Sequence, residues 1–148
     1  MVTSISRSPG ETFDLGRRWA EGACLGWVIA LSGDLGSGKT QIVKGLAAGL
    51  GVVERVHSPT FALVHEYRSA EWVLHHLDLY RLETREAIQR AGLEEYLLSP
   101  VGVCVVEWAE RWFDEGAQIR FVPPQLRRVW IEVTGPAERR IRYEDTGA

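Results

Sequence analysis

The chain reads GDLGSGKT from Gly33 to Thr40. It matches the pattern G-x-x-x-x-G-K-[ST] of a phosphate-binding loop. Its glycines let the backbone curl so that successive N–H groups point inward at phosphate oxygens. Lys39 supplies a point charge for the β- and γ-phosphates, and the Thr40 hydroxyl is a hard oxygen ligand suited to Mg²⁺. The sequence therefore predicts a binder of nucleoside triphosphates.

The residues on either side of the loop predict the strand and helix that the motif requires. Upstream, the apolar run from Gly26 to Ser32 is long enough for one buried strand. Downstream, apolar residues from Gln41 to Leu50 recur at helical spacing, and Gly51 stands where a helix C-cap glycine belongs. A helix that begins at the loop adds its positive end to the anion site. These flanks favour a phosphate loop over a chance glycine-rich turn with a surface lysine.

Patterns elsewhere predict strands and helices that alternate early and strand pairs that follow later. Ser8-Pro9-Gly10-Glu11 is a capping box, so a helix is expected from about Pro9 to Ala23. Further strands are expected at 61–67, 72–77, 101–106, 127–133 and 139–143, and the charged segment 82–98 is expected to be helical. Together these elements predict a mixed sheet with helices on its faces.

Length and composition predict one globular domain spanning residues 1–148. The chain has 148 residues, of which 45% are hydrophobic, enough for a single core. No stretch has the length of a membrane span, and the first twenty residues lack the pattern of a signal peptide. Cys24 and Cys104 lack metal-ligand spacing and are expected to be inert thiols of a cytoplasmic protein.

The charged residues argue against nucleic-acid binding by the chain alone. The net charge is −3, whereas neutralising phosphates needs an excess of basic residues. The cations are nearly all arginine, and the last third of the chain is crowded with them, among them Arg120, Arg127, Arg128, Arg139, Arg140 and Arg142. We interpret this cluster as a solvated hairpin face with acidic neighbours, in preference to a partner or phosphate surface.

Two carboxylates stand where phosphoryl transfer would need them. Such chemistry requires acids near the phosphate loop, to hold a metal and to orient water. Glu107 ends the apolar run 101–106, as a Walker B acid does, and Asp78 ends 72–77 in the same way. Either acid could instead begin a helix or turn as an N-cap.

Other candidate residues remain open between a functional and a structural role. Thr60, in the segment Ser58-Pro59-Thr60-Phe61, could contact the metal or the γ-phosphate as switch threonines do, or simply enter a strand. Trp108 could be a platform beside the nucleotide, although core packing is favoured. The histidines are interpreted as strand-face residues without a catalytic role: His57, His65, His75 and His76.

Four motifs, taken in order, resemble the TsaE family, which is also called YjeE. They are the phosphate loop, SPTF at 58–61, HLDLYRL at 76–82 and VEW at 106–108. The segment GLEEY at 92–96 is also similar to the family. The resemblance covers nearly the whole chain. Ser37, Gln41 and Leu77 depart from the commonest family residues, but none of these changes removes a ligand that the chemistry needs.

The resemblance implies an α/β, P-loop NTPase-like three-layer fold. With the strand patterns, we expect a mixed, mainly parallel sheet and a C-terminal antiparallel hairpin. It further implies a Mg-dependent ATPase that is weak alone and depends on partners, with ATP and Mg²⁺ as cofactors. The implied partners are TsaD and TsaB, a pair that transfers a threonylcarbamoyl group to the tRNA adenosine beside the anticodon. Contact with tRNA is expected only indirectly, through the complex.

Family roles carry over to matching positions of this chain. Thr40 and Glu107 resemble the Mg²⁺ ligands. Asp78, Glu107 and Thr60 match the residues needed for hydrolysis, Thr60 as the switch threonine. The nucleotide-binding positions are Pro9, Gly33, Leu35, Gly36, Ser37, Gly38, Lys39, Thr40 and Arg139.

Two other functions use the same loop. A small-molecule kinase would need an acceptor pocket and a mobile lid, for which little chain remains. A nucleotide-gated binding module would differ from an ATPase only in its negligible turnover, and a sequence does not encode a rate. The preference for ATP over GTP follows from the resemblance alone.

Overall fold

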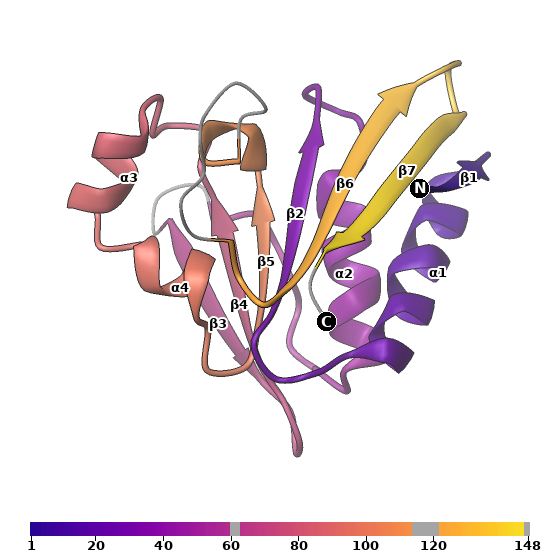
Figure 1. Ribbon diagram of the computed structural model, residues 1–148. Coiled ribbons are helices and arrows are strands. Elements are labelled where there is room, and N and C mark those ends of the chain that lie inside the picture. Colours follow the sequence, from indigo (N-terminus) through magenta and orange to yellow (C-terminus); the bar gives the residue numbers. More distant parts are fainter. Residues whose placement is uncertain (60–62, 114–121, 147–148) are drawn as a thin grey trace.

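A computed structural model describes residues 1–59, 63–113 and 122–146. Seven strands within these ranges form one sheet in the order β1-β7-β6-β2-β5-β4-β3 (Figure 1). The strands are β1 Val2–Ser6, β2 Trp27–Gly33, β3 Val64–Arg68, β4 Val73–Asp78, β5 Val103–Glu107, β6 Gln125–Val133 and β7 Arg139–Thr146. The helices are α1 Pro9–Trp19, α2 Lys39–Gly49, α3 Arg85–Arg90 and α4 Glu94–Leu98, with 3-10 turns at Ala20–Gly22 and Ala109–Arg111.

The centre of the sheet is parallel and both of its sides are antiparallel. β6, β2, β5 and β4 run parallel to one another, whereas β3 joins β4, β7 joins β6 and β1 joins β7 in antiparallel fashion. The predicted mixed sheet and C-terminal hairpin are therefore confirmed. The expectation of a mainly parallel sheet is met only in its centre. Among the described residues, three strand pairings are parallel and three are antiparallel.

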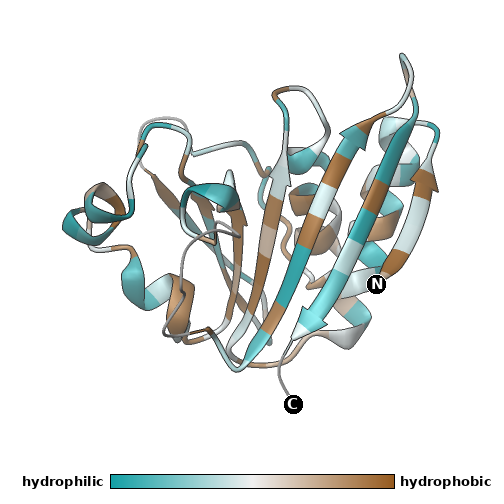
Figure 2. Ribbon diagram, turned by 45° about the horizontal axis from the view of Figure 1, so that its top comes forward, coloured by the Kyte–Doolittle hydropathy of each residue, from teal (hydrophilic) through white to brown (hydrophobic). Residues whose placement is uncertain are grey.

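Helices cover both faces of this sheet and give it a hydrophobic core on each side. One core joins α1 and α2 to side chains such as Ile29, Leu31 and Val105. The other joins α3 and α4 to Cys104 and Val106. Alternation along β5 thus sends its side chains to opposite cores, which is why the strand reads as a continuous apolar run. Hydrophobic colour is accordingly concentrated in the central strands (Figure 2).

The first helix follows its predicted boundaries closely. Ser8 is the N-cap, and its Oγ accepts a hydrogen bond of 3.1 Å from the Glu11 N–H. The helical path continues through the 3-10 turn to Gly22. Leu15 and Trp19 are buried on its inner face, whereas Phe13 is only half-buried. Small residues let the helix pack closely on α2, an arrangement that brings its N-terminal end beside the phosphate loop.

Some elements differ from the prediction for identifiable reasons. β1 has no predicted counterpart, because its exposed side chains give it a weak pattern and it forms by pairing with the distant β7. Segment 82–98 holds two short helices, since Gly92 adopts a φ of +78° between them. The predicted strand 61–67 begins at Val64 among the described residues; Phe61 and Ala62 lie outside them.

The C-terminal arginines confirm the predicted acidic neighbours only in part. Arg127 pairs with Asp145 at 2.7 Å across the hairpin, and Arg140 pairs with Glu132. The Arg127 guanidinium also lies 4.0 Å from the Tyr143 ring centre. This side chain therefore packs on an aromatic ring and does not lie on a purely solvated face. Arg139 departs from the prediction because it contacts the phosphate loop. Arg120 lies outside the described residues.

Both cysteines are free thiols, as predicted. Cys104 is completely buried, and this burial raises the pKa of its thiol. Within the described ranges, every helix is too short or too polar to cross a lipid bilayer.

Candidate functional site

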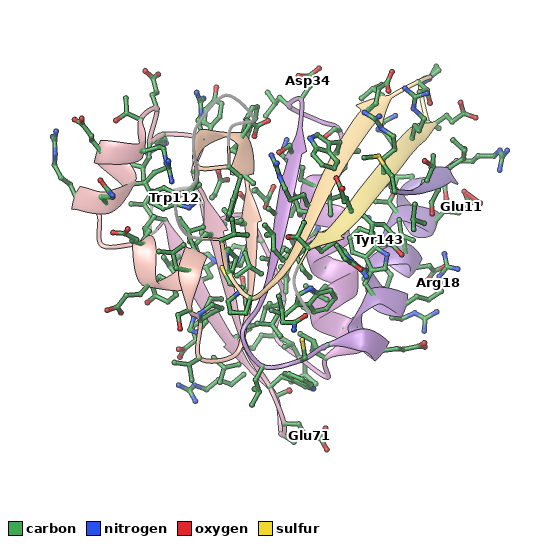
Figure 3. All side chains as sticks on the ribbon, viewed as in Figure 1. Glu11, Arg18, Asp34, Glu71, Trp112 and Tyr143 are labelled. Carbon is green, nitrogen blue, oxygen red and sulfur yellow. The ribbon has the colours of Figure 1, made fainter. Side chains whose placement is uncertain are left out.

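The phosphate loop joins the end of β2 to the start of α2 at one edge of the sheet. Figure 3 labels Asp34 at this edge and Glu71, in the β3–β4 turn, at the opposite one. Gly38 is the N-cap of α2 with a φ of +105°, a conformation that side chains rarely adopt. A Cβ on Gly33 would lie 2.7 Å from Ser37 Oγ and 2.8 Å from the Ile131 carbonyl oxygen. The loop therefore needs glycine at both positions.

Lys39 is held inside this loop. Its Nζ donates to the carbonyl oxygen of Gly33 and, at 3.0 Å, to that of Asp34. The same ammonium group lies 4.1 Å from the centre of the Trp108 ring. Burial lowers the pKa of Lys39, while nearby carboxylates, chiefly that of Glu107, act in the opposite direction. The loop thus carries one enclosed cation beside an acidic group.

The two predicted acids lie side by side at the carboxyl ends of their strands. Asp78 of β4 is the register partner of Glu107 of β5. Thr40 Oγ1 donates to the Glu107 carboxylate, at 3.0 Å from Oε1 and 3.1 Å from Oε2. Asp78 accepts from Ser58 Oγ at 2.8 Å and from the Tyr80 N–H at 2.9 Å. The sheet thereby brings both acids to the mouth of the phosphate loop.

These oxygen atoms fit a magnesium ion that is shared with a nucleotide. Because the Thr40 hydroxyl donates its hydrogen bond to Glu107, the lone pairs of its oxygen can face a cation. Mg²⁺ prefers oxygen ligands and commonly takes one or two from protein, the rest coming from phosphates and water. No cluster of three acidic, histidine or cysteine side chains suited to a metal occurs among the described residues. The site therefore suits a metal that arrives with phosphate oxygens.

Two hollows flank the phosphate loop and share its residues 36–38. One, of about 350 Å³, is lined by Lys39, Thr40, both acids and Trp108. The other, of about 320 Å³, is lined by the start of α1, by Gln41 and by the β6–β7 turn. The first hollow thus brings the Lys39 ammonium group together with both acids, and the second lies on the other side of the same loop.

Arg139 and Pro9, two positions far apart in sequence, meet at the second hollow. Arg139 donates from Nε to the Ser37 carbonyl oxygen at 3.1 Å and from Nη2 to that of Gly36 at 3.3 Å. The Pro9 carbonyl oxygen accepts from Gln41 Nε2 at 3.2 Å. The structure therefore gathers the predicted nucleotide-binding positions around one loop. Thr60 lies outside the described residues, and its switch role stays a prediction.

Sequence reasoning missed His76 and undervalued Trp108. His76 lies on a face of β4, as interpreted from the sequence, but it is fully buried with Nε2 2.5 Å from Glu107 Oε2, a contact that the sequence analysis did not predict. Alternation along β4 places His76 on the same face as Asp78, but it does not show that the side chain meets Glu107. Trp108 packs against the second core as predicted and also contacts Lys39, with a strained φ of +58°.

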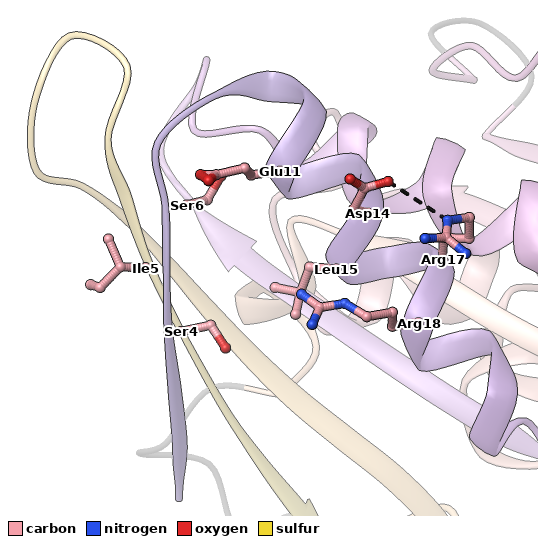
Figure 4. Close-up of a pocket in the computed structure, with 8 residues that line it drawn as sticks. All are labelled: Ser4, Ile5, Ser6, Glu11, Asp14, Leu15, Arg17 and Arg18. Carbon is pink, nitrogen blue, oxygen red and sulfur yellow. Dashed lines mark ion pairs between the residues drawn. The ribbon is translucent and has the colours of Figure 1, made fainter.

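A further hollow, of about 250 Å³, lies between β1 and α1, away from the phosphate loop (Figure 4). Its lining includes Arg17 and Arg18 but also Glu11 and Asp14, and Arg17 pairs with Asp14 at 3.6 Å. Because the acidic side chains offset the two arginines, the lining of this hollow does not favour the binding of a polyphosphate. The phosphate loop thus remains the candidate site.

Comparisons with known proteins agree with this location. A family model described as threonylcarbamoyl adenosine biosynthesis protein TsaE matches residues 6–141. A protein of Bacillus subtilis named tRNA threonylcarbamoyladenosine biosynthesis protein TsaE is 37% identical over 140 residues, which is 95% of this chain and 83% of the relative. A Synechocystis protein of the same name is 46% identical over 99 residues, which is 65% of this chain and 62% of the relative.

A solved structure is also similar over nearly the whole chain. The crystal structure of YdiB from Bacillus subtilis superposes with a TM-score of 0.75 at 32% sequence identity. The superposition covers 99% of this chain and 86% of that one. The mixed seven-stranded architecture is therefore shared with a solved relative.

Proposed function

Because this chain belongs to the TsaE family, we propose that it binds and hydrolyses ATP as the TsaE component of tRNA threonylcarbamoyladenosine modification. The observation that carries the proposal is the contact between Thr40 and Glu107, 3.0 Å apart at the mouth of the phosphate loop. This contact joins the loop's metal-binding hydroxyl to a strand-end carboxylate, the pairing that nucleotide hydrolysis needs.

The two hollows divide the nucleotide between them in this proposal. The triphosphate lies along the loop, where backbone N–H groups at the start of α2 face its oxygens. Lys39 turns from the Gly33 and Asp34 carbonyls to the β- and γ-phosphates. The nucleoside occupies the second hollow, between Pro9 and Arg139. Arg139 holds the loop's carbonyl oxygens away from the phosphates.

Thr40 and Glu107 would hold Mg²⁺, and Asp78 would position the attacking water. The metal, when bound, supplies positive charge that offsets the phosphate oxygens. Asp78 is suited to its role because Ser58 and the Tyr80 N–H fix both carboxylate oxygens in place. Thr60, two residues after Ser58, would sense the γ-phosphate, and its release after hydrolysis would reset a TsaD–TsaB complex.

The proposal is tested by phosphate release from Mg·ATP, with and without TsaD and TsaB. We expect slow release by the chain alone and faster release with both partners, accompanied by nucleotide-dependent co-purification. Lys39→Ala is expected to abolish nucleotide binding, whereas Lys44→Ala, which changes the other lysine of the same helix, is expected to preserve it. Absence of complex formation in every nucleotide state would refute the role in tRNA modification.

The same assay separates the two competing functions. Transfer of the γ-phosphate to an added metabolite would identify a small-molecule kinase. Tight nucleotide binding without release, even with both partners, would identify a nucleotide-gated binding module. Phosphate released to water supports the ATPase.

A further inference from the structure

A buried histidine lies behind the acid of the proposed metal site. His76 is fully buried on β4, and its Nε2 lies 2.5 Å from Oε2 of Glu107, itself only 3% exposed. The two residues are diagonal neighbours on one face of the sheet, since Asp78 is the register partner of Glu107 and His76 precedes it by two. From the first core, Leu74 and Val105 flank the pair on the same face.

The contact has one possible arrangement when the imidazole is neutral. A carboxylate only accepts hydrogen bonds, so the proton of the ring must lie on Nε2. The other ring nitrogen, Nδ1, is buried and has no hydrogen-bond partner in the part of the chain that the structure describes. In this arrangement His76 directs its single donor at Glu107 and at no other described group.

We propose that His76 is the positioning residue of the metal site, acting through Glu107. The proposal rests on the proposed function, because it assumes that Glu107 and Thr40 hold Mg²⁺ with the nucleotide. Glu107 accepts from Thr40 on its loop side and from His76 on its buried side. With Oε2 anchored by His76, the carboxylate cannot rotate away from Thr40. Hydrogen-bonded partners of this kind orient ligating groups, and their loss costs about 10–100-fold in metal affinity.

A purely structural role for His76 makes a different prediction. If the histidine only satisfied a buried acid, its replacement would lower the stability of the fold and leave metal affinity unchanged in the folded molecules. If it positions Glu107, metal affinity falls while nucleotide binding without metal persists, because Lys39 and the loop remain intact.

The test uses the complete chain with ADP and Mn²⁺, a paramagnetic substitute for Mg²⁺ whose binding is measured directly by electron paramagnetic resonance. We expect His76→Leu and His76→Asn to weaken Mn²⁺ binding to the protein–ADP complex by at least ~10-fold. His76→Gln is expected to stay within about 3-fold of wild type, since its amide nitrogen can reach the place of Nε2. Calorimetry without metal should give ADP affinities within about 2-fold for all variants that fold.

His75→Leu is the matched control. His75 is the preceding residue of β4, is also buried, and points to the other face, where its ring centre lies 4.9 Å from that of Tyr96 with the two planes tilted by 56°. We expect this variant to bind Mn²⁺ as wild type does. Should His76→Leu fail to fold, the comparison of His76→Asn with His76→Gln carries the test, because both are polar and only the longer one reaches Glu107.

Two results overturn the inference, and they are distinguishable. Equal Mn²⁺ affinity in wild type and in folded His76→Asn would refute the role of His76 and leave the proposed function intact. A wild-type protein that binds ADP but no Mn²⁺ would refute the metal site, and the inference with it.

Discussion

At the scale of single residues, the surroundings of Lys39 bear on the proposed binding of a polyphosphate. Its ammonium group is buried and is satisfied by two carbonyl oxygens of its own loop and by the Trp108 ring. Burial of the ammonium group disfavours its charged form, and a triphosphate would restore the favourable surroundings. The Lys39 ammonium group therefore already lies in the proposed phosphate site, and a bound phosphate would stabilise its charged form.

The lowered pKa of Lys39 predicts a pH dependence of nucleotide affinity. Below that pKa the lysine is charged and affinity is constant; above it the neutral amine must take up a proton to bind phosphate, so affinity falls as pH rises. We expect the fall to begin below the ordinary lysine value of 10.5. Calorimetry with metal-free ADP over an alkaline pH series measures it. A Lys44→Ala control should follow the same curve, and an affinity unchanged up to pH 10.5 would contradict the prediction.

Replacement of Glu107 by alanine is predicted to separate binding from hydrolysis. Thr40 loses its carboxylate partner, so Mg²⁺-dependent phosphate release should fall by ~100-fold or more. Metal-free nucleotide binding should persist, because Lys39 and the loop are unchanged. The measurement is phosphate release under saturating Mg·ATP, with Glu95→Ala, an exposed acid on α4, as the control. Equal turnover in wild type and Glu107→Ala would exclude the metal-binding role.

The sequence predicted the residues of the site better than their contacts. Asp78 and Glu107 could be found because each follows an apolar strand, and strand ends in parallel sheets gather at one edge. His76 could not be assigned, because its contact with Glu107 depends on the register of β4 against β5, which no local pattern specifies. Arg139 was known only through a family resemblance, since its contact with Ser37 spans 102 positions of the chain.

At the scale of elements, the packing of α1 on α2 sets the position of the second hollow, which is lined by the start of α1 and by the phosphate loop. A Cβ on Gly45 of α2 would lie 1.9 Å from the Phe13 carbonyl oxygen of α1. The two helices can approach so closely only because this position lacks a side chain. Their contact in turn holds the start of α1, including Thr12, beside Gly38 of the loop.

We predict that Gly45→Ala destabilises the fold. The added methyl group must push the two helices apart, at a cost of about 1–3 kcal/mol or more in the free energy of unfolding. Urea unfolding of the purified variant measures this change. Gly10→Ala is the matched control, because the nearest atom to its added Cβ would be Ser8 Oγ at 3.7 Å. For Gly10→Ala we expect a change of at most about 1 kcal/mol, in the stabilising direction. Equal stability of Gly45→Ala and wild type would show that the helices tolerate separation.

Elements with strong local signals were predicted well, and those that depend on distant partners were not. α2 and β5 follow from helical spacing and from an unbroken apolar run. β1 could not be found, because the side chains of Val2 to Ser6 are mostly exposed and the strand exists through its pairing with β7. The boundary between α3 and α4 depends on the backbone of Gly92, whose φ of +78° interrupts an otherwise helical charge pattern.

At the scale of the whole molecule, the proposed nucleotide site joins segments from both ends of the chain. Residues from α1, the phosphate loop, the two central acids and the β6–β7 turn surround it. A ligand that contacts all of them stabilises the folded state against global unfolding, because the unfolded chain cannot hold these segments together.

We therefore predict a large shift of the melting temperature on nucleotide binding. At about 100 times the dissociation constant, a ligand adds about 2.7 kcal/mol to the free energy of unfolding. For a chain of this length, that corresponds to a rise in Tm of roughly 5–10 °C. Scanning calorimetry with Mg·ADP measures the shift, and Lys39→Ala should show none. A shift of equal size in Lys39→Ala would indicate that the nucleotide binds elsewhere.

The pairing of Asp78 with Glu107 has a consequence for how the central strands find their alignment during folding. β5 carries apolar side chains on both faces. A shift of one residue against β4 would therefore still bury apolar side chains in each core. The buried contact between His76 and Glu107 distinguishes the observed register, since a slip of one residue would break it. The residues of the proposed site therefore also help to set the register of β4 against β5. A substitution among them can cause misfolding by register shift as well as a loss of catalytic rate.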